Sequence, residues 1–203
     1  MLKTELTKFY MLLMVSSILA GFNSAANAQT LKINSQTSTM TIAGTTNVHN
    51  FQSKVTQISG ELVISGKKVQ SLKVDIPVKS IKSNEKLMDS KTYEAFNAEK
   101  NPTITFQLTD AVVEKATAED IDVAVTGNLT MAGVTKKITF NTTGKTLKAG
   151  TFQFTGSVGL KMTDFKMKPP TAMLGIMKVG DAITLKFSIV MVGDPEVNAL
   201  LSK

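Results

Sequence analysis

The chain of 203 residues has no cysteine, no tryptophan and a single histidine, His49. Without cysteine it can form no disulfide and use no thiol nucleophile, so stability must come from burial and strand pairing. A lipid anchor attached through cysteine is excluded for the same reason. One histidine cannot build a multi-histidine metal site. We therefore predict neither a metal nor a cofactor.

Arginine is also absent, although the formal net charge is +7. Arginine is the preferred residue for forked recognition of phosphates and base edges, so we expect no nucleic-acid partner. The lysines are scattered among expected strands and turns, and a solubilising surface is the plainer interpretation. Attraction to an anionic membrane surface, as a peripheral contact, stays open as an alternative.

Groups for catalysis are few. A Ser-His-Asp triad would have to use His49, and no serine lies in a recognisable nucleophile motif. His49 is then either a structural strand residue or a polar contact at a ligand pocket. Asp164 either caps a turn or touches a ligand head group. The carboxylates do not pair and no glycine-rich phosphate loop is present, so we predict no enzyme.

The N-terminus has the three parts of an export signal. Lys3 and Lys8 give a positive start, an apolar run covers 9–22, and small residues stand at Ala26 and Ala28. The run is shorter than the roughly 20 residues of a membrane-spanning helix, although an uncleaved anchor is the alternative. We predict a signal peptide over 1–28, cleaved near Ala28-Gln29. The remaining 29–203 would be a single domain, periplasmic or secreted.

Apolar residues of the mature part alternate with polar ones. The period of two is typical of strands with one face on a core and the other in water. It is clearest at 183–191, recurs at 72–78, 104–108, 123–131 and 152–162, and is shorter at 38–44, 47–58, 60–65 and 137–144. These segments predict an all-β fold of mainly antiparallel strands, closed as a barrel or packed as a sandwich.

Two segments break this alternation. Residues 84–98 have helical spacing of apolar positions and Asn84 as a plausible N-cap, with Asn101-Pro102 beyond them. We predict one helix there. Residues 163–181 contain Pro169-Pro170, which forbids regular pairing, and are strongly apolar. We expect this loop to fold over the mouth or core of the β-structure.

The chain also carries a series of motifs in a fixed order. They are Gly44-Thr45-Thr46-Asn47-Val48-His49-Asn50-Phe51, Ile58-Ser59-Gly60-Glu61-Leu62, Val78-Lys79-Ser80-Ile81-Lys82-Ser83, Met88-Asp89, Tyr93-Glu94-Ala95-Phe96, Asn101-Pro102-Thr103-Ile104-Thr105-Phe106, Gly127-Asn128-Leu129-Thr130-Met131-Ala132-Gly133-Val134-Thr135-Lys136 and Val179-Gly180-Asp181. Their order over about 38–192 resembles the YceI-like family of exported lipid-binding proteins.

This resemblance implies an eight-stranded antiparallel, lipocalin-like barrel with one inserted helix and a core over about 38–192. It also implies a long apolar pocket for a polyisoprenoid-like chain. The sequence departs from the family pattern in two places, because no extended segment separates Phe51 from Ile58 and the 168–173 loop is unusual. Both changes would alter the length of the pocket.

We take as candidate ligand-binding residues the expected inward aromatic and methionine side chains together with polar groups near the mouth. They are His49, Phe51, Phe106, Phe140, Phe154, Met162, Asp164, Phe165, Met173, Leu174 and Phe187.

Two hypotheses follow for function. The first is a non-catalytic module that carries an apolar, isoprenoid-like lipid in the barrel. The second is a structural or stress-response protein with a side-chain-filled barrel that acts through a protein partner, because methionine and phenylalanine also fill ordinary cores. The sequence leaves the oligomeric state open, a homodimer included.

Overall fold

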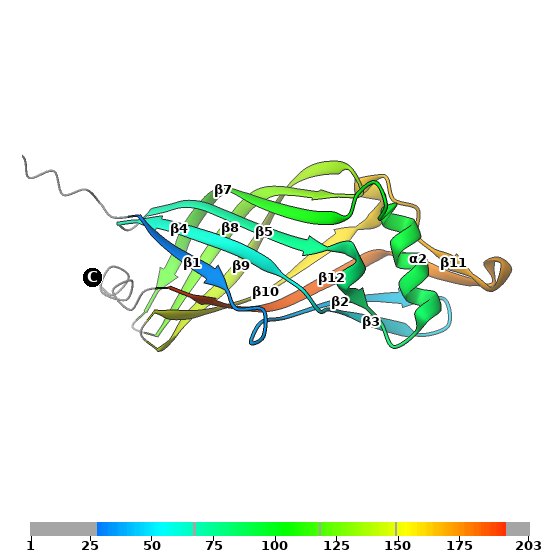
Figure 1. The fold of residues 1–203 in the computed structure, drawn as a ribbon, viewed down its shortest axis with the longest axis horizontal. Helices are drawn as coiled ribbons and strands as arrows, with labels where there is room; N and C mark the ends of the chain where they lie inside the picture. Colours follow the sequence, from blue (N-terminus) through cyan, green and yellow to red (C-terminus); the bar gives the residue numbers. More distant parts are fainter. Residues whose placement is uncertain (1–27, 67, 118, 149, 194–203) are drawn as a thin grey trace, which may run out of the picture.

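The computed structural model describes residues 28–66, 68–117, 119–148 and 150–193. The predicted signal peptide therefore lies outside the described residues, except for Ala28. The described chain forms an elongated β-barrel with the helix α2 at one end (Figure 1). We call this the helix end, and the opposite end the hairpin end.

Eight antiparallel strands close the barrel, in agreement with the prediction. Three of them are interrupted, so that each consists of two segments. The segment pairs are β1 (Gln29–Ile33) with β2 (Thr39–Thr46), β3 (Asn50–Val55) with β4 (Ser59–Ser65), and β5 (Lys68–Pro77) with β6 (Ile81–Lys82). The five uninterrupted strands are β7 (Thr103–Ala116), β8 (Asp120–Met131), β9 (Val134–Lys148), β10 (Thr151–Lys161) and β12 (Met177–Val192).

Pairing of the first strand with the last closes the ring. Near the hairpin end, Ile33 of β1 lies opposite Met191 of β12. Towards the helix end, Ile42 of β2 lies opposite Leu185 of the same strand. Every other neighbouring pair is consecutive along the chain, which gives an up-and-down barrel.

Hydrogen bonds hold the interruptions of the first three strands, both between neighbouring strands and within the interruption between β5 and β6. The Thr56 backbone N–H donates to the Ser80 carbonyl over 2.9 Å. The Ser80 hydroxyl donates to the Pro77 carbonyl over 2.7 Å. The Val190 N–H donates to the Ser38 hydroxyl over 2.9 Å. These bonds satisfy buried backbone groups where the regular ladder stops.

The strand predictions were wrong in two respects. Strand β1 was not predicted, because its five residues include only two apolar ones, Leu31 and Ile33. The predicted strand 47–58 is shortened to β3, because a turn occupies 47–49 and an interruption follows Val55. In that turn, the Thr46 hydroxyl accepts hydrogen bonds from the backbone N–H groups of Val48 and His49.

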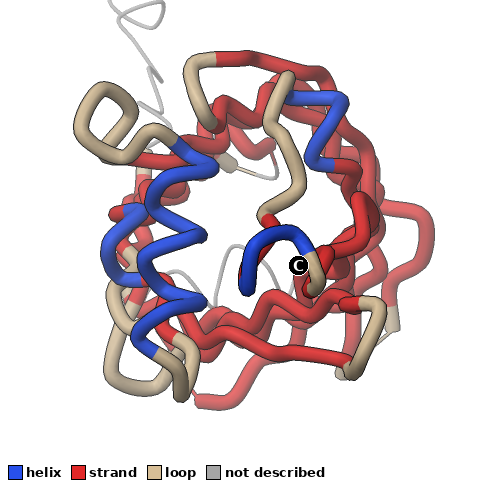
Figure 2. Tube along the Cα trace, turned by 90° about the vertical axis from the view of Figure 1, so that its right-hand side faces the viewer, coloured by secondary structure: helices blue, strands red, loops and turns tan. Residues whose placement is uncertain are grey.

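Helix α2 (Lys86–Phe96) lies within the predicted 84–98 and crosses one side of the barrel end (Figure 2). The predicted N-cap was wrong, since Glu85 holds that position and makes no capping bond through its side chain. Asp89 anchors the helix instead, because its carboxylate accepts hydrogen bonds from the Ser83 N–H over 2.7 Å and from the Ser83 hydroxyl over 2.8 Å.

The segment between β10 and β12 is irregular, as Pro169-Pro170 predicted. It contains two short 3-10 turns, η2 (Met162–Phe165) and η3 (Met173–Gly175), and the two-residue strand β11 (Thr171–Ala172). Only its first part covers the core, where Phe165 and Met167 are buried. Leu174 and Ile176 are exposed, which corrects the expectation that the whole loop folds inward.

Replacing Asp89 by alanine leaves the Ser83 N–H without its acceptor. We expect the free energy of unfolding to fall by about 1–3 kcal/mol. Asp164→Ala is the matched control, because Asp164 is exposed and forms no hydrogen bond or ion pair with the described residues. It should change stability by less than about 0.5 kcal/mol. Urea unfolding of both variants measures the difference, and equal effects would contradict the anchoring role of Asp89.

Candidate ligand-binding cavity

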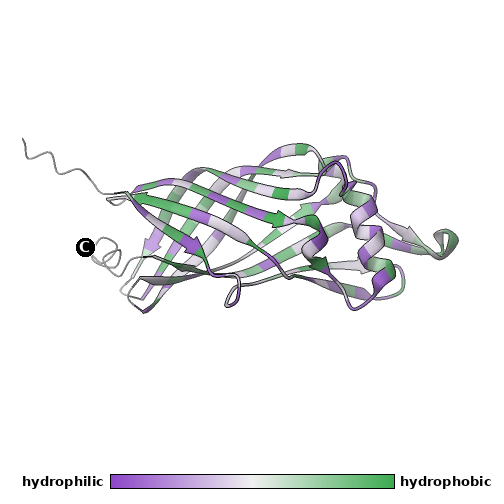
Figure 3. Cartoon of the chain, in the orientation of Figure 1, coloured by the Kyte–Doolittle hydropathy of each residue, from purple (hydrophilic) through white to green (hydrophobic). Residues whose placement is uncertain are grey.

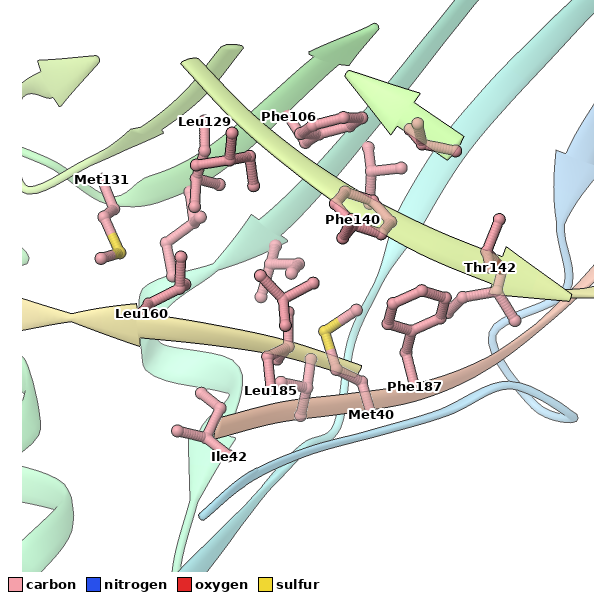
Figure 4. Close-up of a pocket in the computed structure, with 18 of the residues that line it drawn as sticks. Met40, Ile42, Phe106, Leu129, Met131, Phe140, Thr142, Leu160, Leu185 and Phe187 are labelled. Atoms are coloured by element: carbon pink, nitrogen blue, oxygen red, sulfur yellow. The ribbon is translucent and has the colours of Figure 1, made fainter. Parts of the chain in front are cut away.

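The barrel encloses a cavity of about 160 Å³. Inward-facing residues of nearly all its strands line it, and Figure 4 shows their side chains converging on one space. β12 illustrates the arrangement, because every second residue along it points inward. These residues are Ile183, Leu185, Phe187, Ile189 and Met191. The outward-facing polar residues between them give the strands the banded colouring of Figure 3.

Among the described residues that line the cavity, Thr142 is the one polar residue. Its hydroxyl donates a hydrogen bond to the Thr155 carbonyl over 2.9 Å. Its hydrogen-bonding proton is therefore already used within the wall. No charged side chain belongs to the described lining, so the space suits an apolar molecule and offers no group for proton transfer.

Three phenylalanines form an aromatic cluster in the cavity wall. The ring centroids of Phe106 and Phe140 are 5.6 Å apart, and those of Phe140 and Phe187 are 5.8 Å apart with the planes at 80°. Tilted and edge-to-face contacts at these distances are favourable. The cluster gives the middle of the cavity a rigid, flat-sided wall.

Two of these rings lie on glycines of adjacent strands. The Phe187 ring occupies the place where a Cβ of its cross-strand partner Gly156 would stand. The Phe106 ring does the same at Gly127. Since glycine has no side chain there, each ring lies flat against the wall. With alanine at either position, the ring would have to move.

The hairpin end of the barrel is plugged. Buried apolar residues that do not belong to the cavity lining come from the strand ends there. They are Leu31, Ile64, Val123 and Phe152. Leu31 is fully buried. Within the part of the chain that the structure describes, these buried side chains obstruct the route into the cavity at this end.

A second cavity of about 50 Å³ lies beneath α2 at the helix end. One face of α2 lines it with Met88, Thr92, Ala95 and Phe96, the positions whose helical spacing the sequence shows. Ser53, which is buried, adds a hydroxyl to this lining. The second cavity is therefore slightly more polar than the first.

The two cavities share part of their walls. Phe96 and Met131 line both, as do Ile42 and Ile183. These side chains are the partition between the two spaces. Met131 is unbranched and adaptable, so its movement would cost little.

The structure places the candidate ligand-binding residues in several different environments. Phe106, Phe140, Phe154 and Phe187 line the main cavity, and Phe51 and Met162 line the second. Phe165 is buried but belongs to neither lining. His49, Asp164 and Leu174 are exposed. The side chain of Met173 lies outside the described part of the chain.

Sequence reasoning missed the aliphatic part of the lining. Met40, Ile42, Leu72, Leu129 and Leu160 all face the main cavity. Their positions in alternating segments could have revealed them, since each has the inward parity of its strand. The candidates were mostly aromatic and methionine side chains expected to face inward, and the aliphatic residues of the same parity were left out.

The second cavity is bounded by a segment that Asp181 ties down. The Asp181 carboxylate accepts hydrogen bonds from the Thr163 hydroxyl over 2.6 Å and from the Thr163 N–H over 2.9 Å. These bonds lower the pKa of Asp181 below its ordinary value, and the bond from the Thr163 hydroxyl has the largest effect. Asp164 was expected either to cap a turn or to touch a ligand head group, and η2, the turn that contains it, is held by Asp181.

A closed eight-stranded barrel with an apolar interior and a helix at one end defines a lipocalin-like barrel. The family model described as YceI-like domain matches residues 31–191. The chain belongs to the YceI-like family.

Curated relatives match over part of their length. UPF0312 proteins of Pseudomonas paraeruginosa and Pseudomonas aeruginosa are 36% and 35% identical over 106 residues. The match covers 48% of this chain and 52% of each relative, so the chain spans about half the length of the curated relatives it matches.

Solved structures show the same fold at low identity. BcnA of Burkholderia cenocepacia is 21% identical with a TM-score of 0.65, covering 78% of this chain and 98% of that one. A polyisoprenoid binding domain from Saccharophagus degradans is 15% identical with a TM-score of 0.68, covering 80% and 98%. The YceI protein of Campylobacter jejuni is 22% identical with a TM-score of 0.56, covering 70% and 84%.

The described residues offer neither a metal site nor a membrane-spanning helix. No group of three or more histidine, cysteine, aspartate or glutamate side chains is placed to hold a metal ion. No helix in this part of the chain has the length and apolar character needed to cross a membrane.

Gly156→Ala tests whether glycine keeps the Phe187 ring against the wall. We expect the displaced ring to lower the free energy of unfolding by about 1–3 kcal/mol. Gly159→Ala on the same strand is the control, because a Cβ there meets nothing within 4 Å. Adding Phe187→Leu should recover most of the loss in a double-mutant cycle followed by urea unfolding. Additive effects of the two changes would contradict the pairing.

Proposed function

We propose that the protein is a non-catalytic carrier of an apolar, polyisoprenoid-like lipid. The observation behind the proposal is the main cavity, which lies inside the barrel, is apolar and is lined from nearly every strand. Such a cavity favours a binding module over a barrel filled by its own side chains. The polyisoprenoid binding domain from Saccharophagus degradans adds support, since it has the same fold.

Affinity would come from burial of the chain. Each methylene moved from water into the cavity contributes about 0.8 kcal/mol. A branched isoprenoid tail also suits the mixture of flat rings and aliphatic side chains around it. No hydrogen bond or catalytic group is needed for tight binding of such a ligand.

The length of the ligand depends on the partition between the two cavities. An apolar cavity near 150 Å³ holds a molecule about the size of benzene. The main cavity, at about 160 Å³, is of that order, so a longer chain needs more room. We infer that an entering chain displaces Phe96 and Met131 and joins the two spaces. The Ser53 hydroxyl would then face the polar end of the ligand.

The location of the protein belongs to the same proposal. The export signal read from residues 1–28 would deliver the carrier to a periplasm or outside the cell. There a lipid must cross water between membranes, and an enclosed apolar cavity shields it.

Leu185→Trp fills the main cavity and tests the proposal. Native mass spectrometry of protein purified without detergent, stripped of lipid and offered polyprenols should show bound chains for the wild type. The variant should bind at least roughly tenfold more weakly, because the added ring takes the space of several methylenes.

The control is Thr184→Trp, at the adjacent position on the same strand, where the side chain faces outward. It should bind like the wild type. Wild-type protein that is empty as purified and takes up no polyprenol would overturn the proposal.

A further inference from the structure

An apolar tip projects from the helix end of the molecule. It consists of Val48 in the turn between β2 and β3, and Leu174 and Ile176 in the segment around η3. All three side chains are highly exposed, at 67%, 106% and 71%. In Figure 1 this segment extends beyond the barrel, next to the label β11, and in the end-on view of Figure 2 it stands before the barrel's centre.

The two parts of the tip are tied together through Asn47. Its side-chain amide donates to the Ile176 carbonyl over 2.9 Å, and its side-chain oxygen accepts from the Lys178 N–H over 2.8 Å. Its own backbone N–H donates to the Lys178 carbonyl over 3.1 Å. The turn and the η3 segment therefore present their apolar side chains as one unit.

Leu174 has a backbone conformation that favours glycine. Its φ is 55° and its ψ is 32°, in the left-handed region, where a bulky side chain is unusual. The following Gly175 also has a positive φ, 88°. The fold thus keeps a large apolar side chain at a strained and fully exposed position, where a small polar residue would be easier to accommodate.

Between Asp164 and Asp181, the segment that carries Leu174 and Ile176 has charges of one sign. Lys166, Lys168 and Lys178 are exposed, and residues 165–180 include no aspartate or glutamate. Within the described residues none of the three lysines forms an ion pair. An apolar tip on a segment with unpaired lysines matches a surface that has anionic head groups above an apolar interior.

The base of the tip forms the wall of the second cavity. Met167, Pro170 and Val179 line that cavity, and they precede and follow the tip along the chain. A surface that binds the tip therefore also lies beside the helix end of the barrel. This is the end opposite the plug.

We propose that Val48, Leu174 and Ile176 insert into the head-group region of an anionic lipid bilayer and hold the helix end of the barrel against it. The lysines attract the protein to the anionic head groups, and the apolar side chains set the depth of insertion. Only the purpose of this docking rests on the proposed function. That purpose is to pass a lipid between the bilayer and the cavity without exposing it to water.

Vesicle binding tests the docking directly. The wild type should sediment with vesicles of phosphatidylcholine and phosphatidylglycerol more than with phosphatidylcholine alone, and less as salt screens the lysines. Leu174→Asp should lower the partition coefficient at least roughly tenfold. The variant loses the burial of one leucine side chain in the bilayer and gains a negative charge that the anionic head groups repel. Ile176→Asp should act in the same direction.

The matched control is Leu147→Asp, which places the same charge at an exposed leucine of the hairpin end, 53% accessible. It should bind vesicles nearly like the wild type. Equal losses in Leu147→Asp and Leu174→Asp would overturn the proposal, as would a wild type that ignores both kinds of vesicle. A Leu174-dependent dimer without vesicle binding would also overturn it, in favour of a second copy as partner.

Uptake of polyprenol separates this proposal from the proposed function. Leu174→Asp should load slowly from vesicles and normally from polyprenol dispersed in ethanol. If the wild type takes up polyprenol by neither route, the carrier function fails, while the sedimentation result still decides the docking. If Leu174→Asp loads from vesicles as fast as the wild type, docking by the tip is contradicted.

Discussion

Closure of the ring between β12 and the first strand is the constraint on which the rest of the structure depends. Once the ring is closed, side chains of alternate parity must face one enclosed space, because successive residues of a strand point to opposite sides. Such an interior solvates a charge poorly, and the described lining is apolar apart from Thr142. The same closure leaves the two ends as the only routes inward, and the hairpin end is plugged by residues such as Leu31 and Phe152.

A closed barrel of this size can be filled by its own side chains or can hold a ligand, and the rings of Phe106 and Phe187 act against filling. Each lies over a glycine of the neighbouring strand, which keeps its bulk in the wall. The remaining cavity costs stability, since its lining lacks contacts on one side. A bound chain would restore those contacts, and this links the stability of the fold to the proposed ligand. Phe96 and Met131, at the partition, couple the length of that ligand to the helix end.

Much of this fold could be predicted from the sequence. Strict alternation along 183–191 and 152–162 identified long strands with a buried face, and the spacing of Met88, Thr92 and Phe96 identified the inner face of the helix. What escaped prediction depends on tertiary contacts. β1 is too short to show a period and is defined by its partners β4 and β12. The helix is anchored by Asp89 to Ser83 rather than capped by Asn84, and the glycine–phenylalanine contacts join strands that periodicity treats separately.

The central claim is that the barrel interior receives a lipid chain. A crystal structure of the protein grown with a polyprenol tests it most directly. We predict continuous chain density beside Phe106, Phe140 and Phe187, running past displaced Phe96 and Met131 side chains into the space beneath α2. Density for the chain only on the outside of the barrel, with the cavity walls unchanged and the interior free of it, would contradict the account.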